Sequence, residues 1–398
     1  MTRVGRYDAL ALTAAIWFLA KLLRYAVPPL FATFGRTFGA STATLGAAFS
    51  VMMLCYAAMQ FPAGVLADRF GPVRVVAAGA LVASAAALLV AAAGGFPALV
   101  AAMVLVGAGT GVHKTVAVTL LPRVYDARTG RALGAFDTAG AMGGAVAPVA
   151  VVGLLARPWL SWRALFVAAA AAGVVAAVLF VWRVSARLPA RPSKGAGAAG
   201  GGVSRYASAF ADRRLAGFVG VTVLLSVAYN GVVAFLPLYL TARVGLDAST
   251  AGLLYGGLFL VSLVQPVTGD AADRLGALPV TVALVGLATA GLAGLLVADG
   301  PVVAAAAVAA VGAGNHGFRP VRGAYLVAAA PGDVAGGTLG VARTAIMAAG
   351  ALSPAAVGLV ASTWGFQLAF GALLAASAAG VALAATLAAG TARATRGV

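Results

Sequence analysis

The sequence is poor in acidic residues and contains no glutamate. Its 398 residues include 27 Lys and Arg but only ten acids, all of them Asp, together with two histidines and one cysteine, Cys55. A single cysteine leaves no role for an internal disulfide. The sequence also offers no paired carboxylates in a plausible site, no Cys/His metal spacing and no phosphate-binding G-x-x-x-x-G-K-[ST] motif. We therefore expect a protein that is not an enzyme and that holds no metal or cofactor.

Charged residues of both signs are scarce as well. They make up 9% of the chain, against 62% hydrophobic residues and a mean hydropathy of +1.02. A soluble domain of this length needs more charge to cover its surface. The net charge of +17 is typical of nucleic-acid binding, but here it lies in short loops between apolar segments. We expect an all-α integral membrane protein with no nucleic-acid partner.

Apolar runs of about 20 residues, the length that spans a bilayer, indicate the number of helices. Charges or Gly/Pro clusters separate twelve such runs, and the first is too long and too charged inside for a cleavable signal peptide. The predicted transmembrane helices are 10–33, 42–67, 72–93, 97–121, 131–156, 162–184, 214–241, 249–269, 276–298, 301–327, 335–361 and 365–389.

Basic residues indicate the orientation in the membrane. With the N-terminus inside, 17 of the 27 Lys and Arg fall on the cytoplasmic side, four fall outside and six lie within helices. We expect a multi-pass protein of the plasma membrane with both termini in the cytoplasm.

The two halves of the sequence repeat each other. Gln60 and the segment 68–71 (DRFG) recur as Gln265 and 273–276 (DRLG), and three further segments recur at offsets of 202–206 residues. Six helices in each copy give both copies the same orientation, so we expect two six-helix bundles related by a pseudo-two-fold axis along the membrane normal. The predicted domains are 1–184 and 214–398, joined by a basic, Gly-rich cytoplasmic linker at 185–213.

The loop between the second and third helices carries a family resemblance. The segment GVLADRFGPVR (64–74) resembles the G-x-x-x-D-R-x-G-x-[RK] signature of the major facilitator superfamily of secondary transporters, and GDAADRLG (269–276) is a degenerate second copy. The resemblance covers essentially the whole chain and implies a conformational gate at this loop. The gating residues it implies are Gly64, Asp68, Arg69, Gly71 and Arg74 in the first copy and Asp273, Arg274 and Gly276 in the second.

Several cations lie inside predicted helices, where an unpaired charge is costly. Lys21 and Arg24 lie three residues apart in the first helix, so they share one helical face. In the superfamily, helices 1, 4, 7 and 10 line a central cavity, so the resemblance places Lys21, Arg24, Lys114 and Arg319 on its wall. Arg322 lies one turn beyond Arg319, where both could instead anchor the cytoplasmic end of their helix.

Other polar residues of these helices complete the predicted site. His113 and His316 occupy equivalent depths in the repeat, and Tyr229 and Asn230 fall close to Lys21 when the repeats are superposed. All four are candidate solute contacts, although packing is the alternative role of each. Tyr25 and Tyr56 are further candidates for the first half. Asp137 and Arg343 lie eleven residues before matching prolines, and we expect them to form ion pairs between the halves that serve gating.

An excess of cations in a water-filled cavity selects anions. We therefore expect a secondary transporter of a small organic or inorganic anion, acting as a monomer, with a proton or counter-anion as a possible coupling ion. The helix 4 Arg that the superfamily often uses in proton coupling is replaced by Met103. Two alternatives stay open: an exporter of drugs or other amphipathic compounds, and a transporter-like solute sensor.

Overall fold

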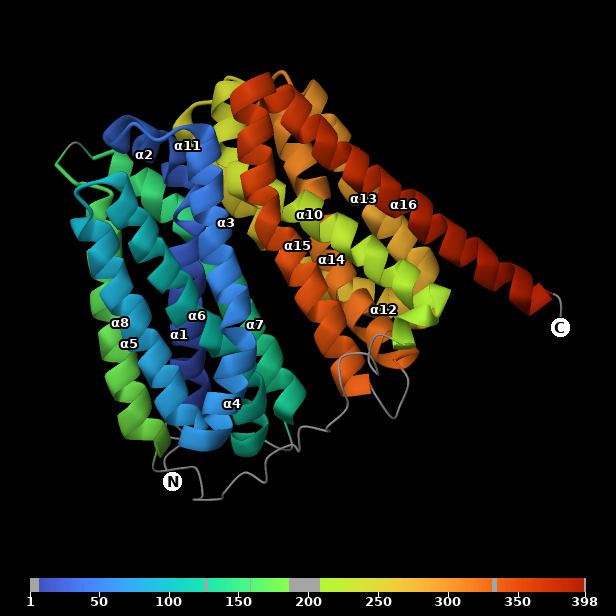
Figure 1. Ribbon diagram of the computed structural model, residues 1–398, viewed down its shortest axis with the longest axis horizontal. Helices are drawn as coiled ribbons and strands as arrows, with labels where there is room; N and C mark the ends of the chain where they lie inside the picture. Colours follow the sequence, from blue (N-terminus) through green and yellow to red (C-terminus); the bar gives the residue numbers. More distant parts are fainter. Residues whose placement is uncertain (1–6, 126–127, 158, 186–207, 331–334, 397–398) are drawn as a thin grey trace. The chain divides into compact units, whose positions relative to one another are not determined.

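The computed structural model describes residues 7–125, 128–157, 159–185, 208–330 and 335–396, and these residues are almost entirely helical (Figure 1). The predicted all-α membrane fold is confirmed, since twelve helices or helix groups in this part of the chain are long and apolar enough to cross a bilayer. By its internal contacts the chain divides into two compact units. Unit 1 holds the described residues up to 185 except 42–47, and unit 2 holds 42–47 and the described residues from 208 onward.

The elements of the first half are α1 (Asp8–Tyr25), the 3-10 turn η2 (Pro28–Leu30), α2 (Phe31–Phe38), α3 (Thr42–Ala58), α4 (Gln60–Phe70), α5 (Pro72–Ala92), α6 (Phe96–Val124), α7 (Thr129–Leu155) and α8 (Arg163–Val184). Those of the second half are the 3-10 turn η5 (Ser208–Ala211), α10 (Arg213–Ala242), α11 (Ala248–Leu260), the 3-10 turn η6 (Val261–Val264), α12 (Gln265–Leu275), α13 (Ala277–Val297), α14 (Pro301–Ala329), α15 (Ala335–Trp364) and α16 (Phe366–Arg396). Most of the predicted 185–213 linker, residues 186–207, lies outside the described residues.

Three spans that the sequence predicts as single helices are broken in the structure. The first runs through α1, η2 and α2, the second through α3 and α4, and the eighth through α11, η6 and α12. Proline has no N–H to donate, and its ring collides with the carbonyl four residues earlier. Pro28, Pro62 and Pro266 each stand at the start of the segment that follows a break, which explains all three interruptions.

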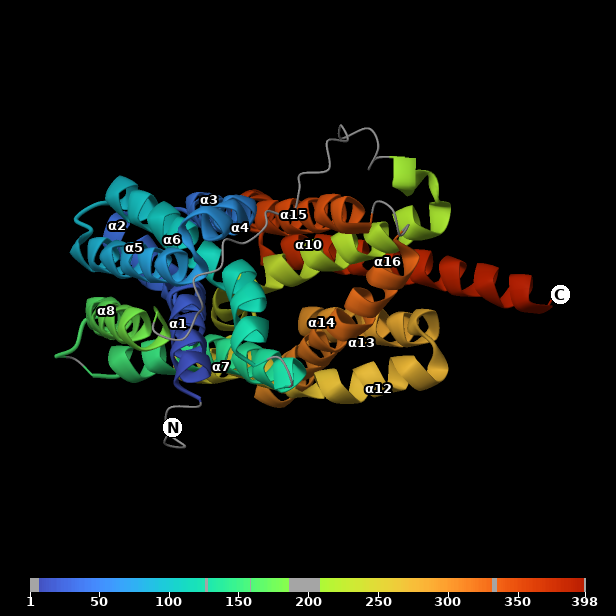
Figure 2. The same cartoon turned by 90° about the horizontal axis from the view of Figure 1, so that it is seen from below.

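The two units share one packing pattern. In unit 1, α1 packs against α7 and α8, and α5 packs against α6 and α8. In unit 2, the corresponding α10 packs against α15 and α16, and α13 packs against α14 and α16 (Figures 1 and 2). The internal sequence repeat therefore reappears as a repeated helix arrangement within each unit.

The repeated VGAG segment has a packing cause. A Cβ at Gly109 of α6 would lie 2.6 Å from the backbone nitrogen of Ala83 in α5. At the equivalent position of unit 2, a Cβ at Gly314 of α14 would lie 2.6 Å from the backbone nitrogen of Ala288 in α13. A side chain at either position would push the helices apart, so glycine is needed for backbone contact between them.

Apolar side chains lie on the outside of the helices as well as in the core. Val175, Val178 and Trp182 on α8 have exposed fractions of 58%, 59% and 65%. The core of the same unit contains fully buried residues such as Leu120 and Phe180. Helices that are apolar on all sides suit a lipid surrounding.

Candidate functional site

The two cations of α1 lie among aromatic rings. Arg24 is 2% exposed, and its guanidinium carbon lies 3.8 Å from the ring centroid of Tyr56 on α3 and 5.3 Å from that of Trp17. Its Nε donates a 3.2 Å hydrogen bond to the backbone oxygen of Ala20. A guanidinium on an aromatic face is attracted by the ring quadrupole, more strongly when water is excluded. Arg24 is therefore a buried, stacked cation.

Lys21 is more open to solvent than Arg24. Its ammonium lies 4.6 Å from the ring centroid of Tyr25 and 5.7 Å from that of Trp17, and it donates a 3.4 Å hydrogen bond to the Tyr25 hydroxyl. Both rings are four residues from Lys21 along α1, the spacing that places side chains on one helical face. We call Trp17, Lys21, Arg24, Tyr25 and Tyr56 the α1 cluster.

Helix α7 packs against the Trp17 ring of the α1 cluster. The ring of Trp17 stacks on Phe136 with a centroid distance of 5.6 Å and an interplanar angle of 15°. A Cβ at Gly140, one turn further along α7, would collide with the indole of Trp17. Glycine at position 140 therefore makes room for the ring that contacts both cations. Sequence analysis missed Trp17, although its i,i+4 spacing to Lys21 was a usable signal.

Lys114 forms an ion pair. Its Nζ lies 2.9 Å from Oδ1 of Asp137, and the pair joins α6 to α7 within unit 1. Both side chains are partly open to solvent, with exposed fractions of 34% for Lys114 and 54% for Asp137. The proposed partnership of Asp137 with Arg343 remains a prediction. Lys21, Arg24 and Lys114 are thus three cations in membrane-spanning helices of unit 1, and Asp137 pairs with one of them, Lys114.

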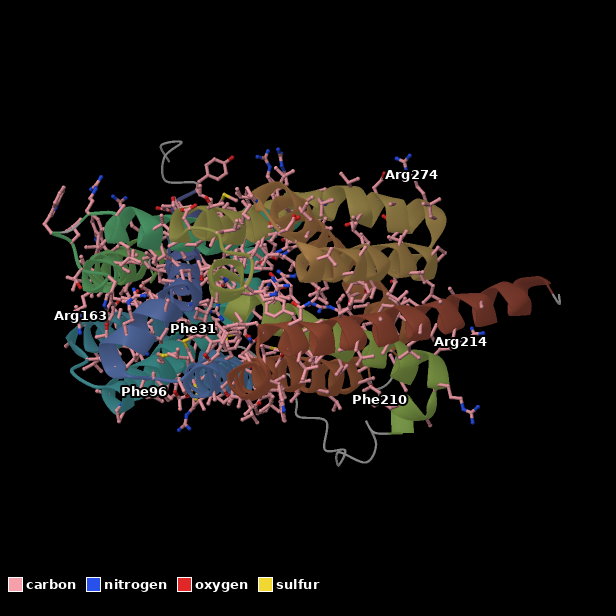
Figure 3. All side chains as sticks on the ribbon, turned by 90° about the horizontal axis from the view of Figure 1, so that it is seen from above. Phe31, Phe96, Arg163, Phe210, Arg214 and Arg274 are labelled. Carbon is pink, nitrogen blue, oxygen red and sulfur yellow. The ribbon has the colours of Figure 1, made fainter. Side chains whose placement is uncertain are left out.

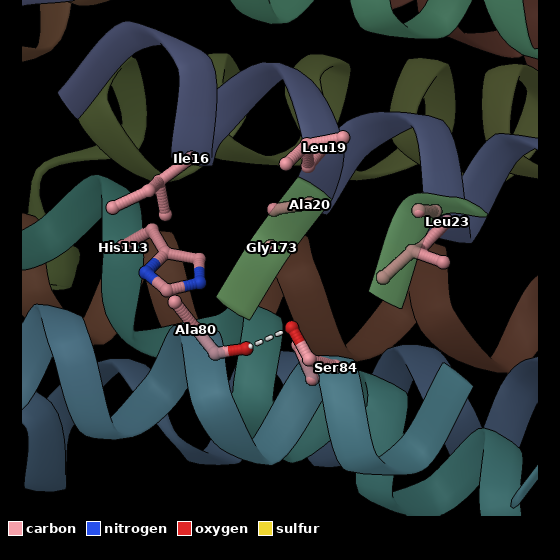
Figure 4. A pocket seen from close by; sticks show the side chains of 10 residues that line it. Ile16, Leu19, Ala20, Leu23, Ala80, Ser84, His113 and Gly173 are labelled. Atoms are coloured by element: carbon pink, nitrogen blue, oxygen red, sulfur yellow. Dashed lines mark hydrogen bonds between the residues drawn. The ribbon is translucent and has the colours of Figure 1, made fainter. Parts of the chain in front are cut away.

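His113 lies in the interior of unit 1. It is 2% exposed and lines a small cavity together with residues of α1, α5 and α8, among them Leu23, Ser84 and Gly173 (Figure 4). Nδ1 of His113 has no hydrogen-bond partner among the described residues, and the Ser84 hydroxyl donates to the backbone oxygen of Ala80 instead. The cavity of about 10 Å³ is close to the roughly 10–15 Å³ that one buried water needs.

In unit 2, three of the predicted residues lie together. The Tyr229 hydroxyl is 3.1 Å from Nε2 of His316, and their rings meet edge to face at 5.5 Å. The guanidinium carbon of Arg319 lies 5.6 Å from the Tyr229 ring centroid. Asn230 is not part of this group, because its Nδ2 donates a 2.9 Å hydrogen bond to the backbone oxygen of Ser226. Arg322 interacts electrostatically with Arg319 and with Arg343 of α15.

The two copies of the loop signature have matching backbones. Gly71 has φ 88° and ψ 144°, and Gly276 has φ 89° and ψ 150°, a region that favours glycine. Each glycine ends one helix and begins the next, α4 to α5 and α12 to α13.

Side chains around these glycines lie mostly at the surface. Arg274 pairs with Asp270 at 3.0 Å on the exposed face of α12 (Figure 3). The guanidinium carbon of Arg69 lies 5.3 Å from the ring centroid of Phe70. Asp68, Arg74 and Asp273 are exposed, and a Cβ at Gly64 would lie 3.9 Å from the Thr115 methyl group of α6.

Comparison with known proteins decides the family. The profile described as Major Facilitator Superfamily matches residues 13–315. The chain belongs to this superfamily. The resemblance predicted from the loop signature is confirmed, and the chain is a multi-pass membrane protein of a transporter family.

Individual relatives are distant. A stretch of 159 residues is 31% identical to an uncharacterized MFS-type transporter, Rv1250, of Mycobacterium tuberculosis (strain ATCC 25618 / H37Rv). This match covers 39% of the chain and only 27% of the relative's length.

Solved structures share the fold. A bacterial homologue of the human lysosomal transporter Spinster, inward-facing and occupied, superposes with a TM-score of 0.79 at 16% identity, with 98% of both chains covered. A point mutant of the nucleoside transporter NupG gives a TM-score of 0.79 at 14% identity, with 96% of this chain and 99% of NupG covered. At these identities the likeness extends to the fold alone.

Proposed function

We propose that the protein is a secondary transporter that moves a small anionic solute across the plasma membrane by alternating access. The observation that carries this proposal is the excess of cations in unit 1. Lys21, Arg24 and Lys114 all lie in membrane-spanning helices; Lys114 pairs with Asp137, while Lys21 and Arg24 lie against aromatic rings. An anion at these cations would offset a charge that is costly in a low-dielectric surrounding.

The aromatic contacts of the α1 cluster stabilise the cations without neutralising them. A cation–π contact leaves the formal charge in place, so the attraction for an anion persists. Lys21 and Lys114 are the more accessible donors, and each ammonium can donate up to three hydrogen bonds. Arg24, stacked and buried, supplies a fixed positive potential beside them, and the edge of its planar group remains suited to a carboxylate or phosphate.

Further roles are proposed for the remaining predicted residues. The proposed further solute contacts are His113, Tyr229, Asn230, His316 and Arg319. The hydrogen bond between Tyr229 and His316, with Arg319 close by, supports a shared site for these three residues of unit 2. The two loop signatures are proposed to act in gating, together with Asp137 and Arg343. Two six-helix domains joined at 185–213, with both termini in the cytoplasm, complete the proposal.

The test compares charge-removing variants in a binding assay. Purified protein is screened by thermal shift against anionic and cationic metabolites, and uptake of each hit is measured in proteoliposomes. Loss of one charge-assisted hydrogen bond costs about 1.5–3 kcal/mol. Lys21→Gln and Arg24→Gln should therefore each weaken anion binding by roughly tenfold to a hundredfold, and Arg24→Lys should restore it only in part.

The matched control is Arg163→Gln. Arg163 also lies over a ring, 4.4 Å from the Trp162 centroid, but it is at the start of α8 and donates a 3.2 Å hydrogen bond to the backbone oxygen of Ala93 (Figure 3). The Arg163→Gln variant should bind anions with the parental affinity. Parental affinity in both Gln variants, or binding of lipophilic cations and no anion, would refute the proposal and favour the drug-exporter alternative. Anion binding without flux would favour the sensor.

A further inference from the structure

The Lys114–Asp137 pair differs from an ordinary surface ion pair in its surroundings. The Arg274–Asp270 pair lies on one exposed helix, four residues apart, with exposed fractions of 75% and 61%. Lys114 and Asp137 instead join two spans and are 23 residues apart in the chain. They lie in a unit whose other interior cations, Lys21 and Arg24, are held by aromatic rings.

The pair is open enough to be broken by a solute. Exposed fractions of 34% and 54% leave both charged groups accessible from outside unit 1, and partly exposed ion pairs contribute little net stability. The carboxylate of Asp137 accepts its hydrogen bond from the Lys114 ammonium as the carboxylate of a bound solute would. An arriving anion therefore finds one of its donors already taken by a chemically equivalent group.

We propose that Asp137 is a tethered counter-anion that occupies Lys114 in the empty protein and is displaced when the solute binds. This inference rests on the proposed anion transport and adds to it a competitor built into the site. While solute is bound, Lys114 contacts the solute. When solute leaves, Asp137 returns, so the ammonium is never left without a partner in the membrane. The carboxylate thus weakens solute binding and assists solute release.

The proposal is tested by titrating the purified full-length protein with anions and measuring the thermal shift at each concentration. The probes are inorganic phosphate and succinate, because their oxygens can accept a hydrogen bond from the Lys114 ammonium as the Asp137 carboxylate does. Asp137→Asn removes the competing charge and should bind the probes about tenfold more tightly than the parent. Asp137→Glu keeps a carboxylate and should bind as the parent does. Asp299→Asn, at an exposed position between α13 and α14, controls for the loss of one negative charge.

A double variant shows whether the tighter anion binding of Asp137→Asn depends on Lys114. Lys114→Met should lose affinity, and Asp137→Asn added to Lys114→Met should restore none of it. If Asp137→Asn does not fold, Asp137→Ser serves the same purpose at this half-exposed position.

The outcomes separate this inference from the proposed function. Probe binding by the parent with equal or weaker binding by Asp137→Asn refutes the tethered counter-anion and leaves anion transport standing. The same gain in Asp299→Asn also refutes it, since the effect is then one of overall charge. Absence of probe binding in the parent and in every Asp137 variant refutes the proposed anion site itself. Probe binding that appears only on removal of Asp137 supports the inference.

Discussion

Substitution of Gly140 tests the support behind the α1 cluster without changing any charge. A methyl group at this position would lie 2.9 Å from Cε2 of Trp17 and closer still to its Nε1 and Cδ1. Atoms do not approach so closely, so the indole must shift or α7 must move away. Because Trp17 lies against both Lys21 and Arg24, a shift of its ring should also disturb the proposed anion site.

The magnitude follows from a comparison within one helix. Gly134, also on α7, has open space where a Cβ would be placed. Gly134→Ala should gain about 0.5–1 kcal/mol of unfolding free energy, because alanine loses less backbone entropy in a helix. Gly140→Ala makes the same gain but overpacks the site, which typically costs about 1–3 kcal/mol. The difference between the two variants should therefore be about 1–3 kcal/mol.

Two assays read the result. Reversible unfolding in mixed detergent micelles gives the free energies of both variants, and anion titration gives their affinities. Displacement of the ring that positions both cations should weaken anion binding about fivefold in Gly140→Ala, or about 1 kcal/mol, and should leave it unchanged in Gly134→Ala. If Gly140→Ala is as stable as Gly134→Ala, the ring does not fill this space and the reasoning is refuted.

Three further variants address the gate, the unit 2 cluster and one loop. Asp68→Asn should slow solute exchange in proteoliposomes more than it weakens binding, and exchange at the parental rate would contradict a gating role. Tyr229→Phe leaves the buried Nε2 of His316 without its 3.1 Å hydroxyl contact and should lower the unfolding free energy by about 1–3 kcal/mol; an unchanged value would show that this contact is dispensable. Asp247 caps α11, and its hydrogen bonds with the hydroxyl and backbone N–H of Thr250 hold the pKa of its carboxyl below the ordinary 3.8. The lowered pKa stabilises the fold fully above pH 3.8, and this stabilisation is lost as the pH falls from there through the lowered pKa, so the stability advantage of the parent over Asp247→Asn should disappear in acid. A stability advantage that does not change with pH would show that the charge of Asp247 does not stabilise the helix end.

Helices bounded by glycine and proline were predicted almost to the residue. The predicted span 72–93 is α5, Pro72–Ala92, because Gly71 ends the preceding helix and Pro72 suits a first helical position. The predicted span 10–33 was less accurate, since the helix group continues to Phe38. Arg36, three residues beyond the predicted span, lies in the last turn of α2, where an amphipathic segment carries the helix past the end of the apolar run.

The sequence predicts which side chains of the site share one face of a helix better than it predicts the contacts between helices. The i,i+3 spacing that places Lys21 and Arg24 on one face is a local property and could be inferred from the sequence. The Lys114–Asp137 pair depends on the register of α6 against α7, and the stack of Arg24 on Tyr56 depends on the position of α3 beside α1. Hydropathy states which segments are helices but not which side chains meet across them.

Lys21 and Arg24 also affect how the protein is assembled during synthesis. On insertion scales each Lys or Arg at a helix centre costs about 2.5–3.5 kcal/mol, while each Leu, Ile or Phe contributes only about −0.3 to −0.6 kcal/mol. Asp137 follows Arg24 by 113 residues, a delay of roughly 6–23 s at about 5–20 residues per second.

During that interval α1 relies on the rings it carries itself. Trp17 and Tyr25 flank Lys21 at four residues on either side and emerge from the ribosome with it, and Tyr56 follows within the next span. The nascent helix is thus partly shielded before Asp137 has been synthesised. A chain cut short before α7 would leave α1 only marginally inserted and exposed to the quality-control proteases of the membrane.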